Sequence, residues 1–164
     1  MPDNETESTE NAAGANEKGQ TFTIQKVYVK DVSFETPNSP DVFLNTNWQP
    51  DINLNLQSSS SPLGDQGAFE VVLSITVTAN LDKETTAYLC EIQQAGIFNL
   101  AGFDNDTLAF MLGSYCPNLL FPFAREAISD IVTRGGFPQL LLAPVNFEAM
   151  FNQQQQKKAE ETVQ

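Results

Sequence analysis

The sequence predicts an α+β fold in which a four-stranded antiparallel sheet is covered on one face by helices. Four segments between residues 21 and 94 alternate apolar and polar residues with the period of two that marks β-strands. After Gly102 the apolar residues change to the spacing of three and four that marks helices. All expected strands precede all expected helices, which is the order typical of an α+β protein.

The first strand is expected over residues 21–35, and the second is expected to be short, over residues 52–57. A serine-rich turn at 58–64 is expected to end the second strand, while residues 69–78 and 86–94 are expected to pair as an antiparallel hairpin. Strict alternation in the first strand divides its side chains between two faces. One face is expected to carry Phe22, Ile24, Tyr28, Val32 and Phe34, and the other Val27, Val29, Asp31 and Glu35.

Asp106 is expected to cap a helix that Pro117 interrupts. A longer helix is expected from about Asn118, with Gly135-Gly136 as its stop, followed by an irregular stretch over residues 137–144. Asn146 is expected to cap a last helix.

The two ends of the chain differ from the middle in composition. Residues 1–19 hold five acids, one base and no aromatic residue, and we expect them to be a disordered acidic tail. Residues 20–151 are expected to form the folded domain, and residues 152–164 a polar C-terminal tail. The net charge is −13, and the expected domain alone has 14 acids against 5 bases. This balance favours basic partners and argues against binding to nucleic acid.

The composition also excludes most catalytic chemistry. The chain has no histidine, the residue that most often serves as general base and metal ligand, and it lacks the glycine-rich phosphate-binding motifs. We therefore expect no enzymatic activity, no cofactor and no metal site. The start does not resemble a signal peptide and no apolar run approaches 18 residues, so we expect a cytoplasmic protein without direct membrane insertion. Cys90 and Cys116 lack CxxC spacing and are expected to be reduced.

Five segments in order along the chain resemble the SecB family of bacterial export chaperones, and the likeness covers roughly residues 21–151. They are VKDVSFE at 29–35, NWQP at 47–50, LCEIQQAGIF at 89–98, GSYCPNLLFPFARE at 113–126 and GFPQLLLAPVNF at 136–147. The resemblance implies a homotetramer built as a dimer of dimers. It also implies an ATP-independent cytosolic holdase that binds unfolded preproteins and delivers them to the motor SecA for export through the Sec translocase. Two alternatives stay open, namely a SecB-like chaperone dedicated to another client such as an antitoxin, and a purely structural oligomer.

The resemblance also implies roles for particular residues of this sequence. It assigns SecA binding to Asp31, Glu35, Leu89 and Glu91. It assigns client binding to Val42, Phe43, Trp48, Ile52, Leu54, Leu56 and Phe147, and the oligomer interface to Cys90, Ile92, Gln94, Ala124 and Ala127. The residues alone offer a simpler interpretation, in which the acids form an ordinary solvated sheet face and the apolar residues fill a core.

Overall fold

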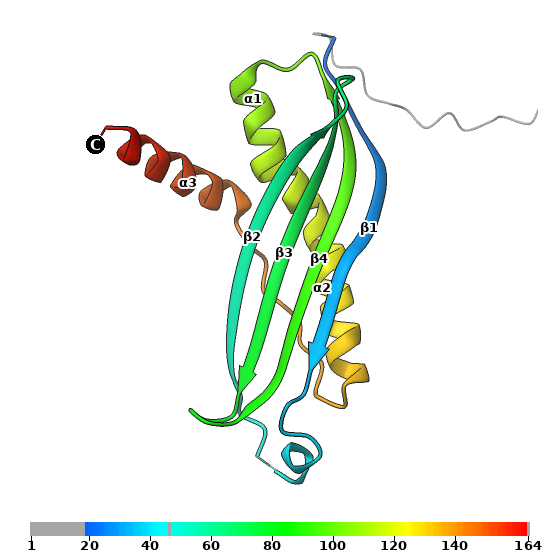
Figure 1. Cartoon of the computed structure of the whole chain (residues 1–164), viewed down its shortest axis with the longest axis vertical. Helices are drawn as coiled ribbons and strands as arrows, with labels where there is room; N and C mark the ends of the chain where they lie inside the picture. Colours follow the sequence, from blue (N-terminus) through cyan, green and yellow to red (C-terminus); the bar gives the residue numbers. More distant parts are fainter. Residues whose placement is uncertain (1–18, 46, 164) are drawn as a thin grey trace, which may run out of the picture.

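The computed structural model describes residues 19–45 and 47–163, so the expected acidic tail lies almost wholly outside the described residues. Four strands form one antiparallel sheet in the order β1-β4-β3-β2 (Figure 1). They are β1 (Thr21–Glu35), β2 (Asp51–Leu63), β3 (Ala68–Asn80) and β4 (Thr86–Ala101). The helices are η1 (Asp41–Leu44), α1 (Asn105–Phe110), the π-helical turn η2 (Met111–Tyr115), α2 (Cys116–Arg134) and α3 (Phe147–Thr162).

The helices α1, η2 and α2 follow one another without a break and cross diagonally behind the sheet in Figure 1. We call the sheet face that α2 packs against the covered face, and the opposite one the open face. The expected four-stranded antiparallel sheet covered on one face by helices is thus confirmed.

The core lies between the covered face and α2. Alternate residues of the two central strands point into it, because side chains along a strand alternate between faces. Helix α2 contributes a stripe at intervals of four residues, and a stripe at this spacing faces one side of a helix. The buried residues are Val71, Leu73, Ile75 and Val77 of β3, Cys90 and Ile92 of β4, and Leu120, Ala124, Ile128 and Val132 of α2.

Strand β1 contains two register shifts, between Ile24 and Lys26 and between Val29 and Asp31. Each shift inserts one extra residue and reverses the faces of the residues that follow. Val27 and Val29 therefore pair with Gly96 and Gln94 on the covered face, while Tyr28 pairs with Ala95 on the open face. The expected placement of Tyr28, Val27 and Val29 was wrong for this reason. The two ends of the strand keep their expected faces, because two shifts cancel.

Strand β2 is longer than expected, since residues 58–63 continue it instead of forming a turn. Ser58 to Ser61 pair in register with Leu73 to Glu70, and Pro62 pairs with Phe69. The strand lies at the sheet edge, where a proline and a serine run are tolerated because one side of the backbone needs no partner strand.

Two expectations for the helices were also wrong. The cap is Asp104, whose side chain accepts a hydrogen bond of 2.8 Å from the Thr107 amide, and not Asp106. Pro117 does not interrupt the helix. It is the second residue of α2, and the turn before it is η2, whose wider geometry makes room for a ring that clashes with the preceding turn of a regular α-helix.

The predicted end of the long helix is confirmed. Helix α2 ends at Arg134, the Gly136 amide donates to the Thr133 carbonyl oxygen, and the Phe137 amide donates to the Val132 carbonyl oxygen. Gly136 has a φ of 90°, which favours glycine in this type of cap. The predicted cap of α3 is confirmed too, since the Asn146 side chain accepts from the Ala149 amide. That helix runs to Thr162, so the expected polar tail is helical over most of its length, with exposed side chains.

The continuous helix Asn105–Arg134 is also long and apolar enough to span a membrane by length and composition, with an 18-residue window of mean hydropathy 1.2. We expected no apolar run near 18 residues. No such run is unbroken, but the mean hydropathy over an 18-residue window of this helix is high, because the few polar residues are outweighed by apolar ones. Core helices pass the same criterion, and this helix packs its stripe on the sheet. Only 33% of the window is buried, which leaves an exposed apolar side.

Gly113 allows α3 to dock on the body, because a Cβ at this position would lie 2.6 Å from Cδ2 of Phe151. We expect Gly113→Ala to displace Phe151 and to accelerate amide hydrogen exchange in the first turns of α3. In a Phe151→Ala background the same alanine has nothing to displace, and its effect on α3 should vanish. Unchanged exchange in α3 of Gly113→Ala would contradict this role of the glycine.

Candidate functional site

Five aromatic rings meet at the end of the sheet where β1 ends and β4 begins. This aromatic cluster consists of Phe34, Phe43, Trp48, Tyr88 and Phe137. Phe137 is central, since its ring centroid lies 5.0 Å from Tyr88, 5.1 Å from Phe43 and 5.5 Å from Trp48. Separations in this range stabilise aromatic pairs beyond the burial of their area.

The helix cap described above builds this cluster. The chain reverses at Gly135-Gly136, and Phe137 follows at once as a buried residue. Cβ atoms at the two glycines would collide with the Phe34 ring and approach the Phe43 ring to 3.2 Å. Both glycines therefore leave the space that the rings of β1 and η1 occupy.

A row of side chains on the covered face of β2 continues from the aromatic cluster. We call it the β2 strip, and it consists of Ile52, Leu54, Leu56, Ser58 and Ser60. Ile52 pairs with Ala79, which pairs in turn with Tyr88 of the cluster. From Ile52 to Ser60 the strip spans about 27 Å, the length of an extended peptide of about eight residues.

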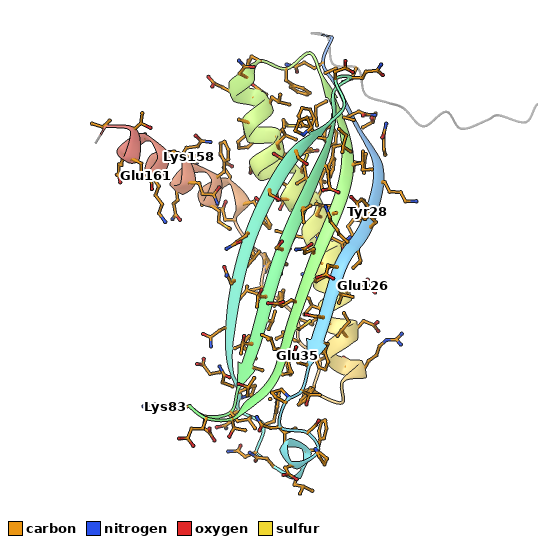
Figure 2. All side chains as sticks on the ribbon, viewed as in Figure 1. Tyr28, Glu35, Lys83, Glu126, Lys158 and Glu161 are labelled. Atoms are coloured by element: carbon orange, nitrogen blue, oxygen red, sulfur yellow. The ribbon has the colours of Figure 1, made fainter. Side chains whose placement is uncertain are left out.

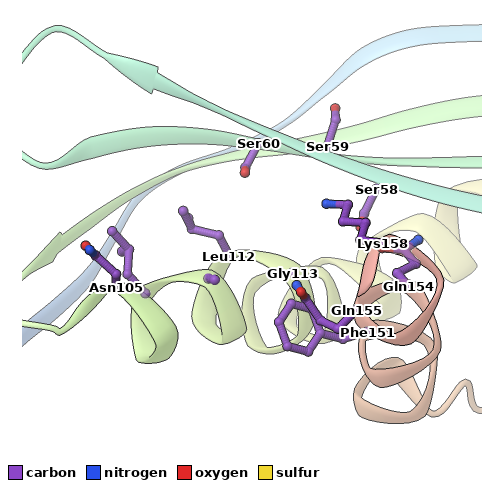
Figure 3. Close-up of a pocket in the computed structure, with 12 residues that line it drawn as sticks. Ser58, Ser59, Ser60, Asn105, Leu112, Gly113, Phe151, Gln154, Gln155 and Lys158 are labelled. Carbon is purple, nitrogen blue, oxygen red and sulfur yellow. The ribbon is translucent and has the colours of Figure 1, made fainter. Parts of the chain in front are cut away.

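The far end of the β2 strip opens into a pocket of about 560 Å³ that lies between β2, the α1 and η2 part of the long helix, and α3 (Figure 3). Ser58 and Ser60 lie on one wall, while Leu108, Leu112 and Phe151 line the opposite side. Figure 3 shows Ser60 directed toward Leu112 and Ser59 directed away, as the alternation of the strand requires. The pocket thus combines apolar walls with hydroxyl and amide groups.

Several apolar side chains of this region are exposed. The exposed fractions are 47% for Phe43, 80% for Leu44 and 40% for Leu54. Val42 is buried and Trp48 is half-buried, so each contributes a smaller accessible area. Six of the seven residues expected to bind clients therefore lie in or beside the aromatic cluster and the β2 strip.

Phe147, the seventh, lies elsewhere. Its side chain is buried against Phe121, with ring centroids 5.7 Å apart, and it anchors the first turn of α3. The structure does not bring it together with Phe43 and Trp48.

The open face carries a second candidate surface. We call Asp31, Glu35, Leu89 and Glu91 the acidic surface; Asp31 pairs with Gln93, Glu35 pairs with Leu89, and Glu91 pairs with Ser33. Directly paired residues share a face, so all four lie together on the open face. Among residues 19–45 and 47–163, none of the three acids forms an ion pair.

Next to the acidic surface, Glu70 of β3 binds two residues of β1. The Lys30 Nζ lies 2.7 Å from Glu70 Oε1, and the Tyr28 hydroxyl donates to Glu70 Oε2. The hydrogen bonds from Lys30 and then Tyr28 hold the pKa of Glu70 below its usual range, and the hydrogen bond to Glu70 raises the pKa of Tyr28. The buried Gln94 side chain donates to the Tyr28 carbonyl oxygen at 3.0 Å, beside the second register shift of β1.

A model of the SecB family, described as preprotein translocase subunit SecB, matches residues 15–158. The chain belongs to the SecB family. The protein-export protein SecB of Nitrosococcus oceani is 56% identical over 145 residues, which cover 87% of each chain. The SecB-like chaperone Rv1957 of Mycobacterium tuberculosis, solved in complex with a ChAD peptide from the antitoxin HigA1, matches with a TM-score of 0.63 at 17% identity. That match covers 76% of this chain and 90% of the mycobacterial one, and it shows the same fold.

The resemblance to the SecB family assigned five residues to the oligomer interface, and four of them are buried in the core of a single chain. Cys90, Ile92, Gln94 and Ala124 are at most 3% exposed, between the covered face and α2. Ala127 is half-buried. An influence of the first four residues on assembly of the protein remains a prediction, and it would act through the packing of the core.

The two thiols are free and buried in the structure. Desolvation raises the pKa of Cys90 to about 11 and that of Cys116 to about 12, so both stay protonated at neutral pH. Burial likewise raises the pKa of Tyr88 to about 12. No cluster of potential metal ligands occurs in the described part of the chain. The two surfaces described above therefore consist mainly of apolar and charged side chains, and neither thiol is accessible at them.

Several residues of both surfaces were not predicted from the sequence. Phe34, Tyr88 and Phe137 belong to the aromatic cluster, and Phe137 could have been found because the residue after such a glycine cap often makes an apolar contact. Glu70 and Lys30 gave no signal, because their contact joins strands that are not consecutive in the chain.

The lowered pKa of Glu70 predicts a pH-dependent contribution to stability. A carboxyl with a lowered folded-state pKa stabilises the protein above its unfolded value of about 4.3, and this contribution is lost as the pH falls through the folded value. Glu70→Gln should therefore reduce the free energy of unfolding at pH 7 and have little effect near pH 3. The loss should be at most about 1 kcal/mol, since the pair is partly exposed.

Urea denaturation of both proteins across this pH range measures the difference. Asp130→Asn, which removes the more exposed Arg134–Asp130 pair, is the control and should cost less. A difference between the wild type and Glu70→Gln that does not change with pH would refute the assignment.

Proposed function

We propose that this protein is an ATP-independent cytoplasmic holdase that binds unfolded preproteins and delivers them to SecA for export. The observation that carries the proposal is the row of accessible apolar side chains that runs from the aromatic cluster along the first half of the β2 strip, namely Phe43, Trp48, Ile52, Leu54 and Leu56. The name of the relative from Nitrosococcus oceani, a protein-export protein, supports the export role. The mycobacterial relative, solved with a bound peptide, supports a polypeptide as the client.

The β2 edge suits an extended client. Edge strands of monomeric proteins are usually protected by charges, prolines or bulges. Strand β2 carries one charge, Asp51, and pairs with β3 without a register shift, while its single proline lies near its end. An unfolded chain along this edge can bring alternate side chains onto Leu54 and Leu56 and reach the pocket beyond them.

Apolar burial gives enough energy for holding but not for permanent binding. A client that buries about 500 Å² of apolar surface gains about 12 kcal/mol before the entropic costs of association and ordering. Those costs leave one site weak. Several such sites on one oligomer raise the effective concentration, so a long client is held tightly and still dissociates without nucleotide hydrolysis.

The exposed apolar residues on the covered side support the proposed homotetramer. Ile24, Val29 and Val32 of β1 are 46%, 48% and 46% exposed, and Phe123 of α2 is 51% exposed. Residues of this kind on two neighbouring elements are typical of a protein interface. We propose that β1 and the outer side of α2 pack against other copies, as the family resemblance implies.

The acidic surface is the proposed docking site for SecA. Its three acids have no ion pair in the described chain, so their charge is available to a basic partner. Leu89 adds an apolar contact between them. The alternative, a dedicated client such as an antitoxin, has its support in the mycobacterial relative; a protein that binds clients but not SecA would favour it.

Leu54→Glu tests the client site. The charge would lie in the middle of the β2 strip, and we expect the affinity for a reduced, unfolded preprotein to fall at least about tenfold, because burying an unpaired carboxylate is costly. Asn55→Glu is the matched control, since it adds the same charge one residue further on the open face.

Calorimetric titration without nucleotide measures both affinities, and light scattering checks that each variant keeps a mass near four times 18.0 kDa. Equal affinities for the two variants would rule out the β2 strip as the client site. A wild-type mass of one chain would rule out the tetramer.

Asp31→Asn and Glu91→Gln test the docking site. Each should weaken SecA binding several-fold and make the remaining affinity less dependent on salt, because one attractive charge is removed. Asp106→Asn at the start of α1 is the control, since it removes the charge of an exposed acid from the side of the sheet that carries the helices, away from the proposed interface of α2 (Figure 1). The same loss of affinity in all three variants would indicate a general effect of net charge and would contradict a localised site.

A further inference from the structure

The second register shift of β1 places a lysine directly beside the acidic surface. Lys30 is the extra residue of this shift, and Asp31 follows it immediately. Both side chains are exposed, and the contact of Lys30 with Glu70 shows that its ammonium group lies on the open face, as Asp31 does. A lysine in this position can pair with Asp31 and neutralise part of the charge that a basic partner would meet.

In the structure Lys30 does not pair with Asp31. Its ammonium group lies 2.7 Å from Glu70 Oε1 on β3, beyond the intervening strand β4. The small residue Ala95 lies between Tyr28 of β1 and Val72 of β3 in the same cross-strand row, which leaves space for side chains to cross β4. Two strand spacings separate β1 from β3 by about 10 Å, so Lys30 extends across the open face away from its neighbour.

The other lysine of β1 lies in the same region of the open face. Lys26 and Glu70 both pair with Ile97 of β4, so they lie in one cross-strand row. Both lysines of β1 are thus near the row of Glu70, while the three acids of the acidic surface lie further along β1 and β4. Figure 2 shows that Tyr28, which binds Glu70, and Glu35 of the acidic surface lie at different heights along β1.

We propose that Glu70 is a positioning residue of the acidic surface, which holds the Lys30 ammonium group near β3 and so keeps its charge away from Asp31. The inference rests on the proposed docking of SecA at this surface. Without Glu70, Lys30 is free to approach the Asp31 carboxylate to about 4 Å instead of about 10 Å, and two unit charges in water interact less than half as strongly at the longer distance. The acidic surface then loses about one charge of attraction.

The test compares SecA binding to Glu70→Gln, Lys30→Met and the double variant by calorimetric titration at low and high salt. Glu70→Gln should bind SecA about threefold more weakly at low salt, the difference between one unit charge at about 4 Å and at about 10 Å in water, and as well as the wild type at high salt. The double variant should regain at least the wild-type affinity, because no lysine is left to mask Asp31. Tyr28→Phe keeps the ion pair and should bind like the wild type.

The rescue separates positioning from damage to the fold. Two results would overturn the role of Glu70, provided that Asp31→Asn still weakens SecA binding. One is a loss of SecA affinity in Glu70→Gln that persists in the double variant, and the other is an unchanged affinity in Glu70→Gln. If Asp31→Asn also binds SecA like the wild type, the acidic surface is not the docking site, and the proposed function fails in that part together with this inference.

Discussion

The packing of one stripe of α2 against alternate residues of β3 and β4 is the constraint on which the other features depend. Leu120, Ala124, Ile128 and Val132 bury the covered face of the central strands. Because the side-chain period of a strand is two, this burial also decides which residues point outward. Glu91 and Leu89 reach the open face because Cys90 and Ile92 are in the core. A slip of one residue in β4 would bury the acid and expose the core residues.

The two edges of the sheet are built differently, and this difference separates their proposed roles. Strand β1 carries two register shifts and four charged residues, whereas β2 has no register shift and one charge. Charges and bulges discourage unspecific pairing of an edge strand. Strand β1 therefore has two different faces. Its apolar residues Ile24, Val29 and Val32 lie on the covered face, and its acids lie on the open face. Strand β2 is suited to contacts that depend little on sequence.

The sequence predicts the elements of this fold well, because alternation and helix caps are local signals. The hairpin of β3 and β4, the end of α2 at Gly135-Gly136 and the cap at Asn146 were all expected and are present. The errors arise where an effect is not local. The faces of Val27, Tyr28 and Val29 depend on two bulges in β1. The side chains that contact β1 beside the second bulge, those of Gln94 and Glu70, come from other strands. The serine run of β2 has the composition of a turn, and only its pairing with β3 makes it part of a strand.

The same distinction applies to the candidate surfaces. The four residues of the acidic surface were expected on one face, because both strands have regular alternation between them. The aromatic cluster was only half expected, since Phe34, Tyr88 and Phe137 come from three elements that meet only after α2 reverses the chain. Phe147 was expected with Phe43 because the family resemblance assigned both residues to client binding. Its contact with Phe121 instead fixes α3, and sequence separation gives no information on that choice.

The placement of the two surfaces has a consequence for how a client could pass to its motor. The β2 strip lies on the covered face, and the acidic surface lies on the open face of the same sheet, so the two proposed sites share no residue. Binding at the strip, as proposed, would be apolar and depend little on salt, whereas binding at the acidic surface would be electrostatic. If both proposed roles hold, a motor on the acidic surface does not occupy the strip itself. Release of the client would then depend on competition for the client chain, which weak individual contacts on several copies would allow one segment at a time.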